Sequence, residues 1–91
     1  MYTLSAKLTF HIPYSSSLKD KRQVRRSLID KTRHLFNAAI AEVATLDNHT
    51  MLTLGVAVVS NSHAHAQQML DEIIRYMETH TDADIVEVEI E

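Results

Sequence analysis

The sequence contains no cysteine and no tryptophan, and only one glycine and one proline among its 91 residues. The lack of cysteine excludes a disulfide scaffold, a cysteine-ligated zinc site and a thiol nucleophile. A single glycine excludes a P-loop and a dinucleotide-binding loop, because each needs several glycines. No apolar run approaches the ~20 residues that span a bilayer. The N-terminus lacks a charged-then-apolar leader, so we expect a cytoplasmic protein that does not enter a membrane.

Charge of both signs is present, but it is unevenly distributed. Residues 1–45 carry eight Lys or Arg and three acids, a net charge of +5, whereas residues 46–91 carry one Arg and nine acids, a net charge of −8. An asymmetry of this size can mark a surface that binds polyanions. The alternative is that the two halves pack together and partly neutralise each other. The sequence leaves both interpretations open.

Alternation of apolar and polar residues predicts the first and last elements. Residues 3–12 alternate without error, which is typical of a strand with one buried face, and Pro13 ends the strand because it has no N–H for the ladder. At the end of the chain, apolar residues alternate with glutamates and predict a half-exposed edge strand, whose charges discourage sheet aggregation. The apolar residues there are Val86, Val88 and Ile90, and the acids are Glu87, Glu89 and Glu91.

Two segments have a helical period. The first extends from Leu18 to about Phe36, and an arc of its surface holds Val24, Leu28, Ile29, Leu35 and Phe36, with Thr32 among them. The second extends from about His63 to Thr79 and is predicted to bury Met69, Leu70, Ile73, Ile74 and Met77. Ser17 is the expected cap of the first helix, with Asp20 completing a shortened capping box, and residues 60–62 supply the second cap.

Two more strands are predicted between the helices, at residues 38–44 and at residues 51–59, joined by a turn. The order βαββαβ predicts an α+β, ferredoxin-like fold with a four-stranded antiparallel sheet in the order 4-1-3-2 and both helices on one face. No linker, repeat or low-complexity tract interrupts residues 1–91, so we expect a single domain. The open face of the sheet has small or polar residues and no aromatic side chain to stack a base. Such a face, on a chain with a small core, favours a homodimer.

Basic residues gather on the first predicted helix. Lys19, Arg22, Arg26 and Arg33 project within about 60° of one another, away from the apolar arc. Their extent along the helix is comparable to the repeat of a phosphate backbone. Lys21 and Arg25 fall nearer the apolar side, so they must lie beyond the sheet edge or extend around it. The alternative is an ordinary solvated helix face.

The start of this helix is a candidate phosphate site. Cations crowd a helix end where the macrodipole is already positive, and a bound anion would offset that cost. Free N–H groups and serine hydroxyls would complete the site, although Asp20 argues against it because Asp20 complements the dipole itself. The candidate phosphate- or RNA-binding residues are Ser16, Ser17, Lys19, Lys21, Arg22, Arg26 and Arg33.

Nothing in the sequence indicates catalysis, a metal or another cofactor. The six histidines lack the spacing of zinc ligands. The three C-terminal glutamates could act as acid and base only with a partner pocket, which no pattern indicates. A small acyl phosphate or phosphate-ester hydrolase using Lys19 and Asn61 is a remote alternative, because the expected glycine-rich loop is missing. We therefore expect a protein that is not an enzyme.

The run Ser17-Leu18-Lys19-Asp20-Lys21-Arg22, preceded by His11-Ile12-Pro13, resembles the YlxP-like family of small bacterial proteins. Further matches are Phe36-Asn37, Ala41-Glu42-Val43, the run from Leu54 to Asn61, Ala64-His65 and the closing run from Val86 to Ile90. The resemblance implies one ferredoxin-like domain in the cytoplasm, with no catalytic residues to carry over. The turn Asp47-Asn48-His49 departs from the family, which often has a large residue there.

Genes of this family often lie beside genes for translation initiation and ribosome maturation factors, which implies a role linked to RNA or the ribosome by association only. Together with the basic helix, this resemblance predicts a non-catalytic module that contacts phosphates of structured RNA or of a ribosomal surface. A dimeric interaction module with a merely solvated basic helix is the alternative.

Overall fold

The computed structural model describes residues 1–91 and contains every predicted element, each within two residues of its expected bounds. The elements in chain order are β1 (Tyr2–His11), α1 (Leu18–Leu35), β2 (Ala39–Ala44), β3 (Met51–Ser60), α2 (His63–Thr79) and β4 (Asp84–Ile90). Neither helix is long and apolar enough to cross a membrane.

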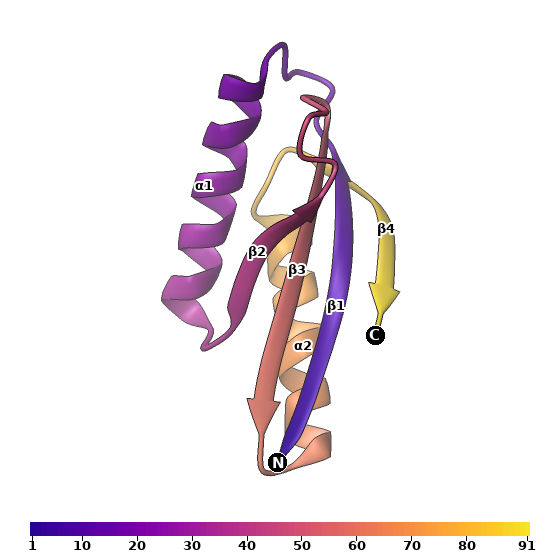
Figure 1. The fold of residues 1–91 in the computed structure, drawn as a ribbon. Coiled ribbons are helices and arrows are strands. Elements are labelled where there is room, and N and C mark those ends of the chain that lie inside the picture. The colour runs from indigo at the N-terminus through magenta and orange to yellow at the C-terminus, as the bar shows by residue number, and fades with distance from the viewer.

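The four strands form one antiparallel sheet in the order β2-β3-β1-β4, which is the predicted order. The central ladder joins β1 to β3 along their whole length, from Tyr2 opposite Ser60 to His11 opposite Met51. β2 and β4 form the two edges, and the register shifts once in each of their ladders. In Figure 1, β4 and β2 lie on opposite sides of this central pair, and α1 lies on the β2 side. This placement decides which strands the helices can cover.

The core lies between one face of the sheet and the helices. β1 and β3 contribute the alternating residues that the sequence predicts, including Leu8, Phe10 and Leu54, all fully buried. α2 adds Ile73 and Met77, while α1 adds only one fully apolar buried residue, Leu28. Because α1 packs on β2 and α2 packs on β3 and β1, the core is centred on the inner strands.

Both predicted helix caps are confirmed. The Ser17 hydroxyl accepts a hydrogen bond from the Asp20 N–H at 3.1 Å, and the Ser62 hydroxyl accepts one from the His65 N–H at 3.3 Å. Each satisfies one of the N–H groups that a helix leaves unpaired at its start.

Two predictions of side-chain burial need correction. Leu35 is exposed although it falls on the apolar arc of α1. The helical period predicts the side of the helix on which a residue lies, but it does not predict whether a strand packs against that side at that position. In β4, the alternating apolar residues are exposed as well as the glutamates: Val86, Val88 and Ile90 retain 56%, 42% and 60% of their accessible surface. The reason is the helix placement, since both helices pack mainly on the other three strands, and of the apolar residues of β4 Ile85 alone packs against the core.

Candidate nucleic-acid interface

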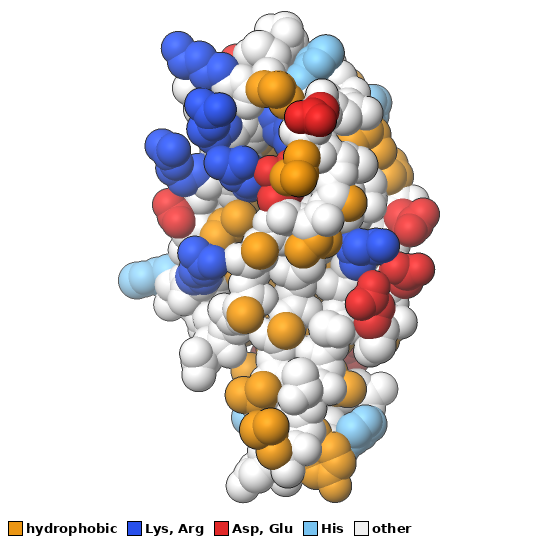
Figure 2. Space-filling view, in the orientation of Figure 1, with side chains coloured by type: hydrophobic (Ala, Val, Ile, Leu, Met, Phe, Trp, Pro, Cys, Tyr) orange, Lys and Arg blue, Asp and Glu red, His pale blue; other side chains and the backbone are white.

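α1 turns one side to the sheet and the other to solvent. Its buried residues, Lys21, Leu28 and Thr32, mark the side that faces the sheet. On the other side, Lys19, Arg22 and Arg26 are exposed, and none of the three makes an ion pair within the molecule. Figure 2 shows Lys and Arg side chains gathered over α1. We call Lys19, Arg22 and Arg26 the cationic row; all three can contact an external anion.

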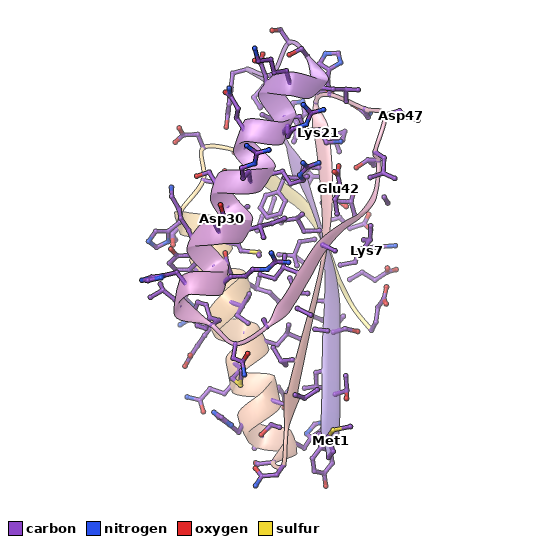
Figure 3. The ribbon with its side chains drawn as sticks, turned by 60° about the vertical axis from the view of Figure 1, so that its left-hand side comes forward. Met1, Lys7, Lys21, Asp30, Glu42 and Asp47 are labelled. Carbon is purple, nitrogen blue, oxygen red and sulfur yellow. The ribbon has the colours of Figure 1, made fainter.

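Lys21 is a predicted phosphate contact that the structure places elsewhere. Its side chain is only 3% exposed, and Nζ lies 2.8 Å from Oε2 of Glu42 on β2. Nζ also donates to the carbonyl oxygens of Thr45 at 2.6 Å and Asn48 at 2.9 Å, in the turn between β2 and β3. Figure 3 shows Lys21 on α1 directed toward the strand that carries Glu42. With Nζ engaged internally, Lys21 does not belong to an exposed anion site, and we remove it from the predicted set.

Glu42 has a buried side chain, and the sequence alone did not identify it as a residue of the site. Its side chain is 7% exposed, and Oε1 accepts a hydrogen bond from Nη1 of Arg25 at 2.9 Å. Burial by itself would raise the pKa of Glu42, but the contacts of Lys21 and Arg25 outweigh it and hold the pKa below its ordinary value. One signal was available in the sequence: Glu42 is the only charged residue in the strand Ala39–Ala44, which follows a basic helix.

The lowered pKa of Glu42 predicts a specific loss of stability in acid. Because the pKa of Glu42 is lower in the folded protein than its ordinary value of 4.5, the ionised carboxylate stabilises the fold at pH values above 4.5. This stabilisation disappears as the pH falls through the pKa that Glu42 has in the folded protein. The difference in unfolding free energy between the wild type and Glu42→Gln should therefore be largest near neutral pH and shrink in acid. Urea titrations from neutral pH to about pH 3 measure this difference.

Glu87→Gln is the matched control, because Glu87 is exposed and makes no ion pair. Its stability should follow the wild-type pH dependence throughout. Parallel curves for wild type and Glu42→Gln would contradict the assigned charge state of Glu42.

The predicted phosphate site at the start of α1 is already occupied by a carboxylate. Oδ2 of Asp20 accepts hydrogen bonds from the Ser16 N–H at 3.0 Å and the Ser16 hydroxyl at 2.8 Å. These bonds to Ser16 lower the pKa of Asp20 below its ordinary value. Ser17 caps the helix by accepting from the Asp20 N–H. Ser16 and Ser17 therefore serve the helix itself, and we withdraw them as phosphate contacts.

Arg33 lies at the far end of α1 and faces the sheet edge. Its Nη2 donates to the carbonyl oxygen of Ile40 on β2 at 2.6 Å. Between Arg26 and Arg33, the exposed Asp30 adds a negative charge to the outward side of α1, where Figure 3 labels it. Arg33 is therefore separated from the cationic row, which occupies about 10 Å of helix rise.

The two oppositely charged halves of the sequence do not neutralise each other. The single ion pair between them joins Lys7 to Glu89 at 3.2 Å, on the surface of β1 and β4. The other two ion pairs connect α1 with Glu42, which belongs to the same basic half. The glutamates of β4 lie at the sheet edge opposite β2, the strand on which α1 packs. The charge asymmetry of the sequence is therefore also a separation in space.

The open face of the sheet contains a shallow groove of about 500 Å³. Small residues line its floor, among them Ser5, Ala39, Ala41 and Ala57. Gly55 also lines this floor, and a Cβ there would lie only 2.9 Å from Cγ1 of Val43, so a larger residue would require Val43 to shift. No aromatic ring lines the groove, and no cluster of three or more His, Asp or Glu side chains is arranged to hold a metal ion.

Comparisons with known proteins agree with the resemblance seen in the sequence. The model of the family described as "Protein of unknown function (DUF503)" matches residues 3–90. The uncharacterized protein YlxP of Bacillus subtilis (strain 168) is 26% identical over 65 residues, 71% of each chain. A de novo designed protein with a ferredoxin fold, solved by solution NMR, superposes with a TM-score of 0.64 at 16% identity, covering 99% of this chain and 85% of the designed one. The ferredoxin-like fold is thereby confirmed.

Proposed function

The chain belongs to the DUF503 family, and we propose that it is a non-catalytic module whose cationic row binds the phosphate backbone of structured RNA. The observation that carries the proposal is the contrast along one helix. Lys21 and Arg25 are held by the buried Glu42, whereas Lys19, Arg22 and Arg26 have no partner and face solvent. Exposed cations with no internal partner can release counterions from a polyanion, which is the main source of affinity for nucleic-acid backbones.

The cationic row supplies affinity without reading sequence. Contacts to phosphates position a protein on nucleic acid but do not distinguish bases. The surface that reads bases in RNA-binding proteins of this topology is the open sheet face, where aromatic side chains stack them. Here that groove has no aromatic lining. The proposal is therefore an adaptor that recognises folded RNA by its charge and shape, on the ribosome or elsewhere in the cytoplasm, and it assigns no catalytic group, metal or cofactor.

The dependence of RNA binding on salt tests this proposal. With three phosphate contacts, the logarithm of the association constant should fall against the logarithm of salt concentration with a slope between about −2 and −3. Fluorescence anisotropy of a labelled RNA hairpin measures the slope. Arg22→Gln should reduce its magnitude by nearly one, whereas Lys31→Gln, on another side of α1, should leave it unchanged. Undetectable binding, or equal effects of the two variants, would refute the proposal.

A homodimer formed through the open sheet face is the second candidate function, and the groove of about 500 Å³ with its small side chains favours it. Small residues allow the close approach of a second sheet. Analytical ultracentrifugation separates the two candidates. A stable dimer that does not retain RNA would support this candidate and oppose the first.

A further inference from the structure

The two edges of the sheet differ in whether a side chain covers them. On the β2 edge, the guanidinium of Arg33 donates to the carbonyl oxygen of Ile40 at 2.6 Å, and α1 packs alongside that strand. On the β4 edge, there is no counterpart to the Arg33 hydrogen bond, and both helices pack mainly on the other three strands. Uncovered edges invite a further strand, and proteins normally cover them, interrupt them or place charges on them. On β4 the protection comes from glutamates, which repel another acidic strand but not a basic one. The β4 edge is thus the open edge of the sheet.

The register shows which backbone groups of β4 are unpaired. The Glu91 N–H donates to the Ser5 carbonyl at 2.9 Å, and Glu89 lies opposite Lys7 in the same ladder. In an antiparallel pair, alternate residues direct both their N–H and C=O groups to the neighbouring strand. Glu89 and Glu91 therefore bond to β1, and Val88 and Ile90 direct their N–H and C=O groups to the free edge. The irregularity in this ladder lies nearer the start of β4, so the last residues of the strand are regular.

The side chains of β4 form two rows of different chemistry. Val88 and Ile90 lie opposite Leu8 and Ala6, on the face that carries the helices, yet they are 42% and 60% exposed. Glu87, Glu89 and Glu91 alternate with them and point to the other face, where Lys7 pairs with Glu89 alone. In Figure 2 acidic side chains gather on the side of the molecule away from the basic cluster of α1. An incoming strand would meet apolar groups on one face and carboxylates on the other.

We propose that β4 is a docking site for a basic, extended segment of a protein partner, which adds to the sheet as a fifth strand. Backbone groups of Val88 and Ile90 provide the hydrogen bonds of strand addition. Alternate Lys or Arg side chains of the partner pair with Glu87 and Glu91, and its apolar residues cover Val88 and Ile90. This site does not overlap the proposed RNA-binding surface. The cationic row lies on α1, α1 packs on the edge strand β2, and β2 and β4 are the opposite edges of the sheet.

Charge selects this occupant over a second copy of the chain. Antiparallel pairing of two β4 strands would bring two rows of glutamates face to face, and like charges directly opposite each other are destabilising. The single nearby cation, Lys7, is already paired with Glu89. A basic strand meets no such repulsion and neutralises the free carboxylates.

Two synthetic peptides test the proposal, one alternating lysine with valine and the other alternating glutamate with valine. The basic peptide should bind at least about tenfold more tightly in isothermal titration calorimetry, because favourable cross-strand pairs replace repulsive ones. Hydrogen exchange followed by NMR should show new protection of the Val88 and Ile90 amides and none in β2. Equal affinity for the two peptides, or protection elsewhere in the sheet, would overturn the proposal.

Two variants of the full chain separate strand addition from simple charge attraction. Val88→Pro removes an outward-facing N–H that β1 does not use, so the sheet should persist while peptide binding is lost. Glu87→Lys/Glu91→Lys keeps the Lys7–Glu89 pair and should reverse the preference between the two peptides. Peptide binding that survives Val88→Pro would contradict strand addition at β4. A preference between the peptides that does not reverse in Glu87→Lys/Glu91→Lys would contradict a basic partner. A dimer of the wild type that dissociates on Val88→Pro would show that a second copy of the chain occupies the edge instead.

Discussion

Replacing Lys21 with methionine is expected to lower the free energy of unfolding by about 3–5 kcal/mol, as removal of one partner of a buried ion pair does. Methionine keeps the unbranched shape of the side chain, without its terminal ammonium, but leaves the buried Glu42 with Arg25 as its only cation. The carbonyl groups of Thr45 and Asn48 lose the Lys21 ammonium as a donor at the same time, and Thr45 keeps only its bond from the Asn48 N–H. Thr45 has a φ of 55°, which is costly for a β-branched residue, so its turn depends on such contacts. The loss is a large fraction of the stability of a small domain.

Guanidinium unfolding followed by circular dichroism measures this loss. Lys31→Met is the control, because Lys31 lies on the same helix but is exposed, and such surface substitutions change stability by only about 0.5 kcal/mol. Lys21→Met/Glu42→Leu, which removes both charges, should recover much of the loss, since apolar pairs often replace buried ion pairs at little cost. If Lys21→Met and Lys31→Met have equal stability, the buried role assigned to Lys21 is wrong.

Neutralising the cationic row is expected to weaken RNA binding roughly 100-fold at low salt, taking about 1 kcal/mol for each exposed contact. The variant is Lys19→Gln/Arg22→Gln/Arg26→Gln. All three side chains are exposed and unpaired, so the fold should be unaffected. Electrophoretic mobility shift of an RNA hairpin measures the loss.

A charge-matched variant, Lys7→Gln/Lys31→Gln/Arg75→Gln, removes the same number of positive charges from β1, α2 and another side of α1. It should retain most of the affinity of the wild type. A similar loss in both variants would mean that net charge, rather than the arrangement on α1, attracts the RNA.

Most of the fold could be predicted because local patterns agreed with one another. The alternation from Leu4 to Ile12, the stop at Pro13 and the caps at Ser17 and Ser62 each specify an element boundary or a buried face. The order of elements then leaves few topologies. Val88 and Ile90 show where this reasoning ends. Their alternation with glutamates indicates which side they face, but only the placement of both helices mainly over the other strands explains why they stay largely exposed.

The candidate site was predictable only in part, because period locates a side chain around a helix but does not reveal its partners. Lys19, Arg22 and Arg26 are exposed as their angles indicate. Lys21 fell near the apolar arc, and the sequence did not reveal that Glu42, 21 residues later, faces it across the α1–β2 packing. The hydroxyl of Ser16 was equally ambiguous until its hydrogen bond to Asp20 was seen.

Ultraviolet crosslinking in living cells, with mass spectrometry to place the attached nucleotide on the chain, is the most direct test of what this helix does. We predict covalently attached RNA on peptides from the first half of α1, and its loss when Lys19, Arg22 and Arg26 are neutralised. Recovery of the protein without nucleic acid, or with nucleotides attached to the sheet and unaffected by that substitution, would show that the outward side of α1 is only a solvated surface.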